Sequence, residues 1–378
     1  MISGFKNVQM YVDGKFVKKS LTVENGKIIN FKSGPNHLTI DEKLYLVPGF
    51  IDEHIHGANG CDSMNGKRAS LLTIATNLAK EGVTSFLATT MTQTETNIIK
   101  ALNAIRDYID EDVKEGAEVL GVHLEGPFIS KVFKGAQPEH AIRKCDRDLL
   151  EKFNHESGDN IRLVTFAYEE NGKEMLDYMV AHGITASIGH TNATSDEALE
   201  AIQNGASCAT HTYNAMKGLH HREAGTLGAV MISDNVYAEL IADLIHVSKT
   251  AIKLLVKTKT VDKMIAITDA MEAKNLKDGT YELGGQEVYV KDGSARLKDG
   301  TLAGSILNLN KGLRNIKEAA GISLEDTIKM ATINPAKNLG ISHFKGSIAL
   351  GKDADFVVID EDFNIYLTVR GGNIVYQK

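Results

Sequence analysis

The chain has 378 residues, which is more than one compact hydrophobic core usually holds. Hydrophobic residues make up 43% of it and charged residues 24%, as in an ordinary globular protein. The formal net charge of -7 argues against nucleic acid or an anionic membrane as the main partner. We therefore expect one large domain with a small satellite domain, acting on a small molecule.

The cysteine usage and the start of the chain predict a cytoplasmic protein. Cys61, Cys145 and Cys208 are odd in number and far apart, which is typical of reduced thiols. The first residues lack the long apolar segment of a signal peptide. No run approaches the ~18 apolar residues that a membrane span needs.

Both ends of the chain look like short strands joined by turns. Asp13-Gly14 and Asn25-Gly26 are dipeptides favoured in two-residue hairpin turns. Because each end alone is too short to bury a core, we predict that residues 1–45 and 341–378 combine into one small β-sandwich domain.

Between the two ends, residues 46–340 alternate apolar strand-like runs with amphipathic helical patterns such as 70–80, 95–108, 173–182 and 195–204. The strand candidates are 46–51, 83–89, 118–123, 161–167, 184–189, 207–211, 236–243 and 264–268. Eight near-continuous apolar strands with crossover helices predict an α/β fold, a TIM-like (β/α)8 barrel. A doubly wound open sheet is the alternative, disfavoured because no glycine-rich dinucleotide turn follows the first strand.

Two local patterns late in this region predict further elements. Residues 272–300 are rich in Gly and Asp-Gly and predict an inserted β-hairpin. Residues 323–332 predict a helix with Ser323 as its N-cap, ended by Asn334-Pro335.

Histidines and an acid recur where the predicted barrel strands end, which is where barrel enzymes place their chemistry. His54 and His56 follow the first strand and point the same way, because strand side chains alternate between faces. His190 follows the fifth strand and His211 ends the sixth. With Glu125 after the third strand as the carboxylate, these imidazoles predict a divalent-metal site that leaves positions for water. The alternative for Glu125 is a surface-loop acid.

Asp269 ends an apolar strand that has no other carboxylate, and an unpaired carboxylate there is costly. It could take a proton from a metal-bound water and pass it to a leaving group, or it could cap a helix. His246, after the seventh strand, and Arg222, in the loop 220–225, are candidates for binding an anionic group, since arginine suits phosphate. Lys217 and Lys134 are rival candidates.

These motifs together resemble the amidohydrolase superfamily. Residues 48–56 are similar to its opening signature, and 334–336 and 346–355 to its usual ending. Within the superfamily the chain resembles the N-acetylglucosamine-6-phosphate deacetylase family most closely, in residues 123–128, 189–194, 211–216, 243–246 and 268–270. The resemblance runs over essentially the whole chain.

The resemblance implies a role for each candidate residue. The main metal ion, zinc or iron, would be held by Glu125, His190 and His211, and a second ion by His54 and His56. Asp269 would activate the hydrolytic water. The sugar phosphate would be bound by Asn214, the backbone of Ala215, Arg222 and His246. The family is typically dimeric, and we expect a homodimer in which Arg222 reaches the neighbouring subunit's site.

One position departs from the family pattern. Some members carry a histidine in the loop after Glu125, where this chain has Gln137. Glutamine can hydrogen-bond a carbonyl or a hydroxyl but cannot act as a cation. We expect Gln137 to bind substrate while the metal carries more of the oxyanion stabilisation.

The implied activity is metal-dependent hydrolysis of N-acetyl-D-glucosamine 6-phosphate to D-glucosamine 6-phosphate and acetate, in amino-sugar catabolism and cell-wall sugar recycling. Deacetylation of N-acetylgalactosamine 6-phosphate is an alternative, because the two sugars differ in one hydroxyl configuration. A cyclic amidase or deaminase is disfavoured, since many of those use a carboxylated lysine where this chain has Glu125. A non-catalytic scaffold would usually have lost metal ligands, and all the candidates are present.

Overall fold

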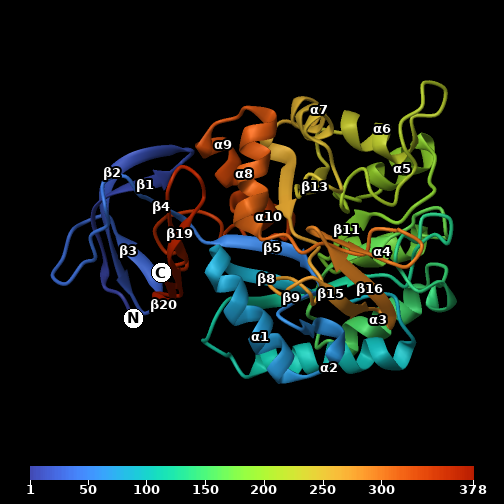
Figure 1. Ribbon diagram of the computed structural model, residues 1–378, viewed down its shortest axis with the longest axis horizontal. Coiled ribbons are helices and arrows are strands. Elements are labelled where there is room, and N and C mark those ends of the chain that lie inside the picture. Colours follow the sequence, from blue (N-terminus) through green and yellow to red (C-terminus); the bar gives the residue numbers. More distant parts are fainter.

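The computed structural model describes all 378 residues. Figure 1 shows a small sheet at one end of the molecule and a larger barrel ringed by helices, with both chain ends in the small sheet. None of the helices combines the length and the apolar character needed to cross a bilayer. The predicted combination of a TIM-like barrel with a small β unit built from both termini is confirmed.

The small sheet has seven strands in the order β20-β19-β18-β4-β1-β2-β3. Their bounds are β1 Gly4–Val12, β2 Lys15–Glu24, β3 Lys27–Asn30, β4 Tyr45–Pro48, β18 Phe356–Ile359, β19 Ile365–Arg370 and β20 Asn373–Gln377. Asp13-Gly14 and Asn25-Gly26 adopt positive φ in the predicted hairpin turns. Gly26 accepts a hydrogen bond from the Ala354 N–H at 2.8 Å, so the β3 edge returns beside the segment before β18. The sheet thus folds over its own apolar core, which includes Phe5 and Phe356.

The barrel sheet has eight parallel strands in the order β14-β13-β12-β11-β10-β9-β8-β5. Their bounds are β5 Phe50–Ile55, β8 Val83–Thr89, β9 Glu118–Glu125, β10 Ile161–Phe166, β11 Thr185–Ile188, β12 Cys208–Ala209, β13 Tyr237–Ile241 and β14 Met264–Ile267. At the seam between β14 and β5, the N–H groups of Ala266 and Ile51 donate to the carbonyls of Met330 and Ala331 at 2.9 and 2.8 Å. The Asp269 N–H donates to the His54 carbonyl at 2.8 Å, which joins the strand ends at the top of this seam.

The strand predicted at 46–51 is two strands, and that prediction was wrong. Tyr45–Pro48 forms β4, which pairs with β1 and β18 in the small sheet, and the barrel strand β5 begins only at Phe50. Gly49 joins them where a side chain would collide with Thr84, since a Cβ would lie 2.1 Å from its Oγ1. The apolar run is continuous in sequence because both strands are buried, so periodicity could not separate them.

A helix follows every barrel strand, as the alternating pattern predicts. The α-helices are α1 Arg68–Leu78, α2 Glu95–Asp110, α3 Arg147–Glu156, α4 Lys173–Ala181, α5 Ser195–Gln203, α6 Gly225–Ile232, α7 Lys249–Lys259, α8 Leu309–Ala320, α9 Leu324–Lys329 and α10 Ile333–Asn338. The short 3-10 helices are η1 Ser63–Asn65, η2 Ala79–Glu81, η3 Glu139–Ala141 and η4 Val261–Lys263. The main core lies between the barrel strands and these helices.

The predicted end of the 323–332 helix needs a correction. Ser323 caps α9 as expected, accepting from the Asp326 N–H at 3.0 Å, but Asn334-Pro335 lies inside the next short helix, α10. Proline is tolerated there because the N–H groups of a first helical turn have no partner within the helix. The Asn334 side chain also donates to the carbonyls of Val261 and Met264, which fixes α10 against the barrel.

Two small sheets lie beyond the carboxyl ends of the barrel strands. The insertion predicted at 272–300 is a three-stranded antiparallel sheet of β15 Gly279–Leu283, β16 Gln286–Lys291 and β17 Ser294–Arg296. A two-stranded piece, β6 Gly57–Ala58 and β7 Cys61–Asp62, follows β5. The insertion packs on Met91 and Met271 and therefore lies beside the strand ends.

Lys345 joins the small sheet to the barrel. Its ammonium is buried and lies 2.8 Å from Glu118 of β9, 3.0 Å from Asp353 and 2.6 Å from Asp355. The two aspartates precede β18, whereas Glu118 begins a barrel strand. Three carboxylates around one ammonium therefore tie the two parts of the chain together.

Candidate active site

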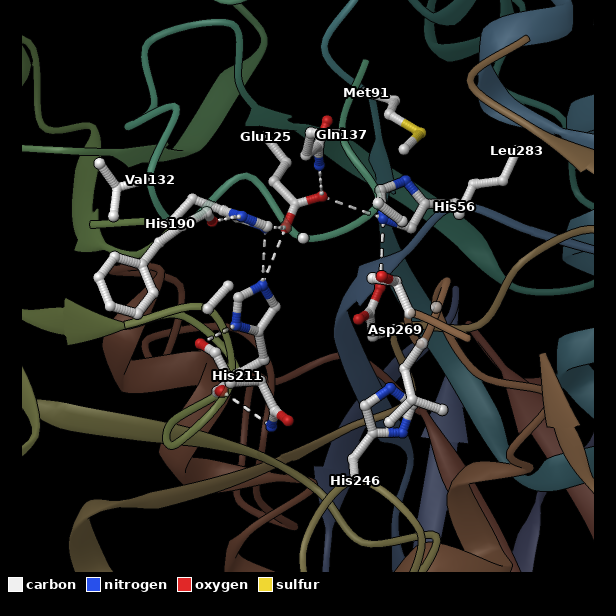
Figure 2. A pocket seen from close by; sticks show the side chains of 18 residues that line it. His56, Met91, Glu125, Val132, Gln137, His190, His211, His246, Asp269 and Leu283 are labelled. Atoms are coloured by element: carbon white, nitrogen blue, oxygen red, sulfur yellow. Dashed lines mark hydrogen bonds and ion pairs between the residues drawn. The ribbon is translucent and has the colours of Figure 1, made fainter. Parts of the chain in front are cut away.

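A cavity of about 300 Å³ opens at the carboxyl ends of the barrel strands. Its wall carries most of the residues that the sequence singled out as metal ligands, proton acceptor and sugar-phosphate ligands. Figure 2 shows Glu125, His190 and His211 facing one another on one side of it, with His56, Asp269 and His246 on the other. Most of the predicted site residues therefore lie together, although they come from different strands.

The first cluster consists of Glu125, His190 and His211. Glu125 Oε1 lies 3.3 Å from His190 Nε2 and 3.2 Å from His211 Nε2, and the two nitrogens are 3.1 Å apart. A tetrahedral ion bound at about 2.1 Å by each of three donors would separate those donors by about 3.4 Å. The three donor atoms therefore have the spacing of a metal triad.

Backbone carbonyls set which ring nitrogen faces the cavity. His190 Nδ1 lies 2.8 Å from the Phe133 carbonyl and His211 Nδ1 lies 3.2 Å from the Asn214 carbonyl. A carbonyl only accepts, so each Nδ1 carries the hydrogen and each Nε2 presents its lone pair to the cavity. Both histidines have positive φ, of 46° and 30°, an uncommon backbone state that concentrates at functional sites.

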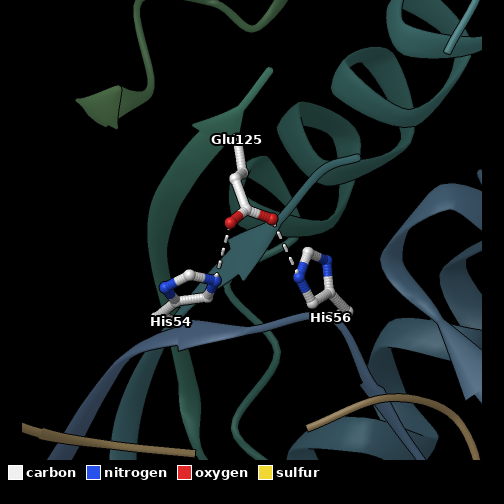
Figure 3. Close-up of side chains that lie close together, drawn as sticks. All are labelled: His54, His56 and Glu125. Atoms are coloured by element: carbon white, nitrogen blue, oxygen red, sulfur yellow. Dashed lines mark ion pairs between the residues drawn. The ribbon is translucent and has the colours of Figure 1, made fainter. Parts of the chain in front are cut away.

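The second cluster lies on the other side of the same carboxylate. His56 Nε2 is 3.1 Å from Glu125 Oε2 and 3.2 Å from Asp269 Oδ1. His54 Nε2 is 3.5 Å from Glu125 Oε1 and 3.4 Å from Asp269 Oδ1, and it has no hydrogen-bond partner although it is fully buried. Figure 3 shows the two rings converging on Glu125. The predicted His54–His56 pair therefore points into the site and shares a carboxylate with the first cluster.

The charges of these groups indicate a cation site. Burial by itself raises the pKa of Glu125, but the surrounding histidines, His54 foremost, hold that pKa well below its usual range. Burial also raises the pKa of Asp269, yet His54 and His56 bring it below its ordinary value. Conversely, burial lowers the pKa of His56, and the carboxylates of Asp269 and Glu125 raise it to about 10. The carboxylates thus need positive charge beside them, and a divalent ion would supply it in place of protons on the rings.

Asp269 is held at the seam of the barrel, with a φ of 48°. Its N–H donates to the His54 carbonyl, and its own carbonyl accepts from the Ser305 N–H at 2.7 Å. The preceding residue, Thr268, donates through its hydroxyl to Asp52 at 2.6 Å. The carboxylate of Asp269 therefore faces the cavity from a backbone that is bonded on both sides.

Glu239 of β13 supports both clusters, and the sequence reading missed it. Its Oε2 accepts from His54 Nδ1 at 3.0 Å and from the His211 N–H at 3.1 Å, and the side chain is fully buried. Glu239 is, like Asp269, a carboxylate in an apolar strand, which is costly unless paired, and this feature of the sequence marks it as a candidate. Such a partner fixes the orientation of a metal-ligating ring.

The candidate sugar-phosphate residues lie on the cavity wall opposite Glu125. His246 donates from Nδ1 to Asp243 at 2.7 Å, and its side chain is 6% exposed, so the ring has one orientation. Asn214 and Ala215 also line the cavity, Ala215 with a φ of 47°. Asp243, which the sequence reading did not single out, thus serves as the support of His246.

Two predicted substrate residues stand apart from this group. Arg222 is exposed and does not line the cavity of its own chain. This position fits the expectation that Arg222 serves a neighbouring subunit, which stays a prediction. Gln137 does line the cavity, but both ends of its amide contact the protein, at Glu125 and Thr92. Direct contact of Gln137 with substrate also stays a prediction.

The chain is similar to known proteins over nearly its full length. The amidohydrolase family model matches residues 45–375. The N-acetylglucosamine-6-phosphate deacetylase of Bacillus subtilis (strain 168) is 46% identical over 334 residues, which cover 88% of this chain and 84% of that relative. The same-named protein of Lysinibacillus sphaericus is 41% identical over 369 residues, covering 96% of this chain and 95% of the relative.

Two further proteins bear on specificity and fold. The N-acetylgalactosamine-6-phosphate deacetylase of Escherichia coli O157:H7 is 34% identical over 346 residues, covering 91% of each chain. The crystal structure of N-acetylglucosamine-6-phosphate deacetylase from Thermotoga maritima superposes with a TM-score of 0.91 at 36% identity, covering 99% of this chain and 100% of that chain. Together with the metal triad and the barrel, these likenesses show that the chain belongs to the amidohydrolase family and, within it, to the N-acetylglucosamine-6-phosphate deacetylases.

Proposed function

We propose that this protein hydrolyses the acetamide of N-acetylglucosamine 6-phosphate to acetate and glucosamine 6-phosphate, in amino-sugar catabolism and cell-wall sugar recycling. The observation that carries the proposal is one cavity in which a candidate metal triad, the carboxylate of Asp269 and the oriented ring of His246 face one another. A metal site alone would fit many hydrolases. Its combination with an anion-binding side chain fits a phosphorylated amide.

Glu125, His190 and His211 would hold the main ion, and His54 and His56 with Glu125 a second one. When bound, such an ion lowers the pKa of water to about 7 and polarises the carbonyl of a substrate. We propose zinc or iron, because neutral imidazole and carboxylate donors suit both.

Asp269 accepts a proton from the attacking water, whose oxygen adds to the amide carbon. The resulting adduct has a tetrahedral carbon and a negatively charged oxygen. Asp269 then returns the proton to the amide nitrogen as the carbon–nitrogen bond breaks, so that acetic acid and a neutral amine leave. The acetic acid then loses its proton to solvent or to the amine, which gives acetate. Its place between the His56 ring and the His246 side of the cavity, in the view of Figure 2, allows it to reach both the water and the nitrogen.

The phosphate anchors the sugar away from the reacting amide. His246, fixed by Asp243, and Asn214 with the backbone at Ala215 would bind it, and Arg222 of a neighbouring subunit would complete the site in a homodimer. Binding energy from the phosphate then positions the acetamide at the ligand triad. We also propose a cytoplasmic location, where the sugar phosphate would be available.

The test is acetate release from three compounds: N-acetylglucosamine 6-phosphate, N-acetylgalactosamine 6-phosphate and unphosphorylated N-acetylglucosamine. We expect the highest kcat/KM on the first, with metal analysis giving one or two ions per chain. A preference for the galacto compound would replace the proposed substrate. Equal rates with and without the phosphate would refute the role given to His246 and Arg222.

A further inference from the structure

The amide of Gln137 has one possible orientation. The backbone N–H of Thr92, which can only donate, lies 2.9 Å from one end of the amide, so that end is the carbonyl oxygen Oε1. The other end is therefore Nε2, and it donates to Glu125 Oε2 at 2.9 Å. Gln137 is only 4% exposed, and Figure 2 shows it directly beside the Glu125 carboxylate.

The two oxygens of Glu125 face different partners. Oε1 faces His190 and His211 at 3.3 and 3.2 Å, and it also lies 3.5 Å from His54 Nε2. Oε2 faces His56 at 3.1 Å and receives the Gln137 hydrogen bond. The bond from Gln137 therefore fixes the rotation of the carboxylate about its last side-chain bond, and with it keeps Oε2 directed at His56.

We propose that Gln137 is a positioning residue that fixes the orientation of the Glu125 carboxylate between the two clusters, and that its loss weakens metal binding on the His54–His56 side first. An oxygen that already accepts one hydrogen bond keeps a lone pair in a fixed direction, towards His56. Without the bond the carboxylate can turn, and the triad keeps two histidines whereas the His56 side depends on Oε2. This role rests on the proposed metal-dependent function, but its test measures metal binding and not activity.

The loop that carries Gln137 supports this role. The Gln137 N–H donates to the Lys134 carbonyl at 2.9 Å, which closes a turn around Gly135. Gly135 has a φ of 54°, and a Cβ there would lie 3.3 Å from His190 Cε1. The turn thus packs against the His190 ring, which faces Glu125 Oε1, while the Gln137 side chain reaches Oε2 of the same carboxylate.

The experiment compares metal binding by the wild type, Gln137→Met and Gln137→Glu. Methionine keeps the length of the side chain and removes both hydrogen bonds. Glutamate keeps an acceptor for the Thr92 N–H, so the turn is retained, but it places a second carboxylate against Oε2. Val132→Ala is the control, because Val132 lines the cavity at 71% exposure and has no polar contact with Glu125. Each full-length protein is stripped with a chelator and titrated with Zn²⁺ against a chromophoric competitor.

We expect two zinc ions per wild-type chain. The two substitutions should have opposite effects on the affinity for the ion on the His54–His56 side. Gln137→Met should lower the affinity for that ion by 10- to 100-fold, the usual effect of losing a partner of a metal ligand, and change the affinity for the other ion by no more than about threefold. Gln137→Glu should strengthen the same ion, because a new carboxylate faces it. His56→Ala removes a ligand of the ion on the His54–His56 side. In that background, adding Gln137→Met should not change the affinity for the ion that remains at the triad.

Three results would overturn the proposal: a single ion in the wild type, shifts of the same sign in both variants, or equal weakening of both ions in Gln137→Met. The first of these would leave the proposed deacetylation intact, since the triad alone can hold an ion. If the wild type binds two ions but releases no acetate, the proposed deacetylation would be refuted and the role of Gln137 would stand.

Discussion

Asp269→Asn isolates the proton-transfer step more cleanly than any other substitution in the cavity. Asparagine has the same shape as aspartate, so it leaves no void and preserves the backbone bonds of this residue to His54 and Ser305. It cannot take a proton from water. The ligand triad of Glu125, His190 and His211 makes no contact with Asp269 among its ion pairs, so the main ion should stay bound.

The size of the effect follows from the role. A positioned general base contributes about 10²- to 10⁴-fold to a rate. At about 1.4 kcal/mol per factor of ten, that is about 3–5 kcal/mol of activation free energy. Because Asp269 serves twice, first as base and then as acid, we expect the loss in kcat to lie near the upper end, while KM changes little.

Acetate release should be measured together with the metal content of the same samples. Asp292→Asn is the matched control, because Asp292 is exposed in the turn between β16 and β17 at a φ of 50°, which asparagine adopts equally well. The control should keep wild-type kcat and KM.

A fall in kcat of less than tenfold with the metal retained would refute the assignment of Asp269 as base. A fall that tracks loss of the main ion would show instead that Asp269 acts as a ligand.

Four further outcomes are expected. Arg222→Ala should raise KM for N-acetylglucosamine 6-phosphate by 10-fold or more and leave the unphosphorylated sugar unaffected; equal changes on both would remove Arg222 from phosphate binding. Removing the metal with a chelator should abolish acetate release and lower the midpoint of thermal unfolding, and adding Zn²⁺ or Fe²⁺ should restore both. Asp243→Asn should lower the free energy of unfolding at pH 7 by about 2 kcal/mol, because a hydrogen bond to a buried carboxylate is lost. Burial raises the pKa of Asp243, but the bond from His246 brings it below its ordinary value. The stabilisation from Asp243 is therefore present above the unfolded pKa of about 3.9 and is lost as the pH falls through the folded pKa. The difference in unfolding free energy between wild type and variant, measured in urea, should shrink below about pH 4. Lys345→Met should cost about 3–5 kcal/mol in the same urea assay, since three carboxylates lose their buried cation, and a cost below 1 kcal/mol would show that they are stabilised by solvent.

The barrel and the clustering of the candidate ligands could be predicted because the relevant signals are local. Each barrel strand is an apolar run followed by a helical pattern, and each ligand stands at the end of such a run. The alternation of strand side chains was enough to place His54 and His56 on one face, where the structure has them. Asp13-Gly14 and Asn25-Gly26 likewise determine their turns through their own backbone preferences.

The parts that sequence reasoning missed depend on contacts between distant segments. The division between β4 and β5 at Gly49 is decided by which sheet each half joins, and both halves are equally apolar. Contact of Gln137 with substrate stays a prediction, but the orientation of its amide is set by Thr92, 45 residues away, and could not be read from the sequence. Glu239 stands out as a carboxylate in an apolar strand, but its partner ring is 185 residues distant, so no spacing in the sequence identifies that partner.

Strand β9 connects the Lys345 contact with the candidate metal site. Its eight residues begin at Glu118, which touches Lys345, and end at Glu125, the carboxylate shared by both clusters. Seven steps of about 3.3 Å separate the two ends by about 23 Å. One strand therefore carries the contact with the terminal sheet at its start and the carboxylate of the candidate metal site at its end.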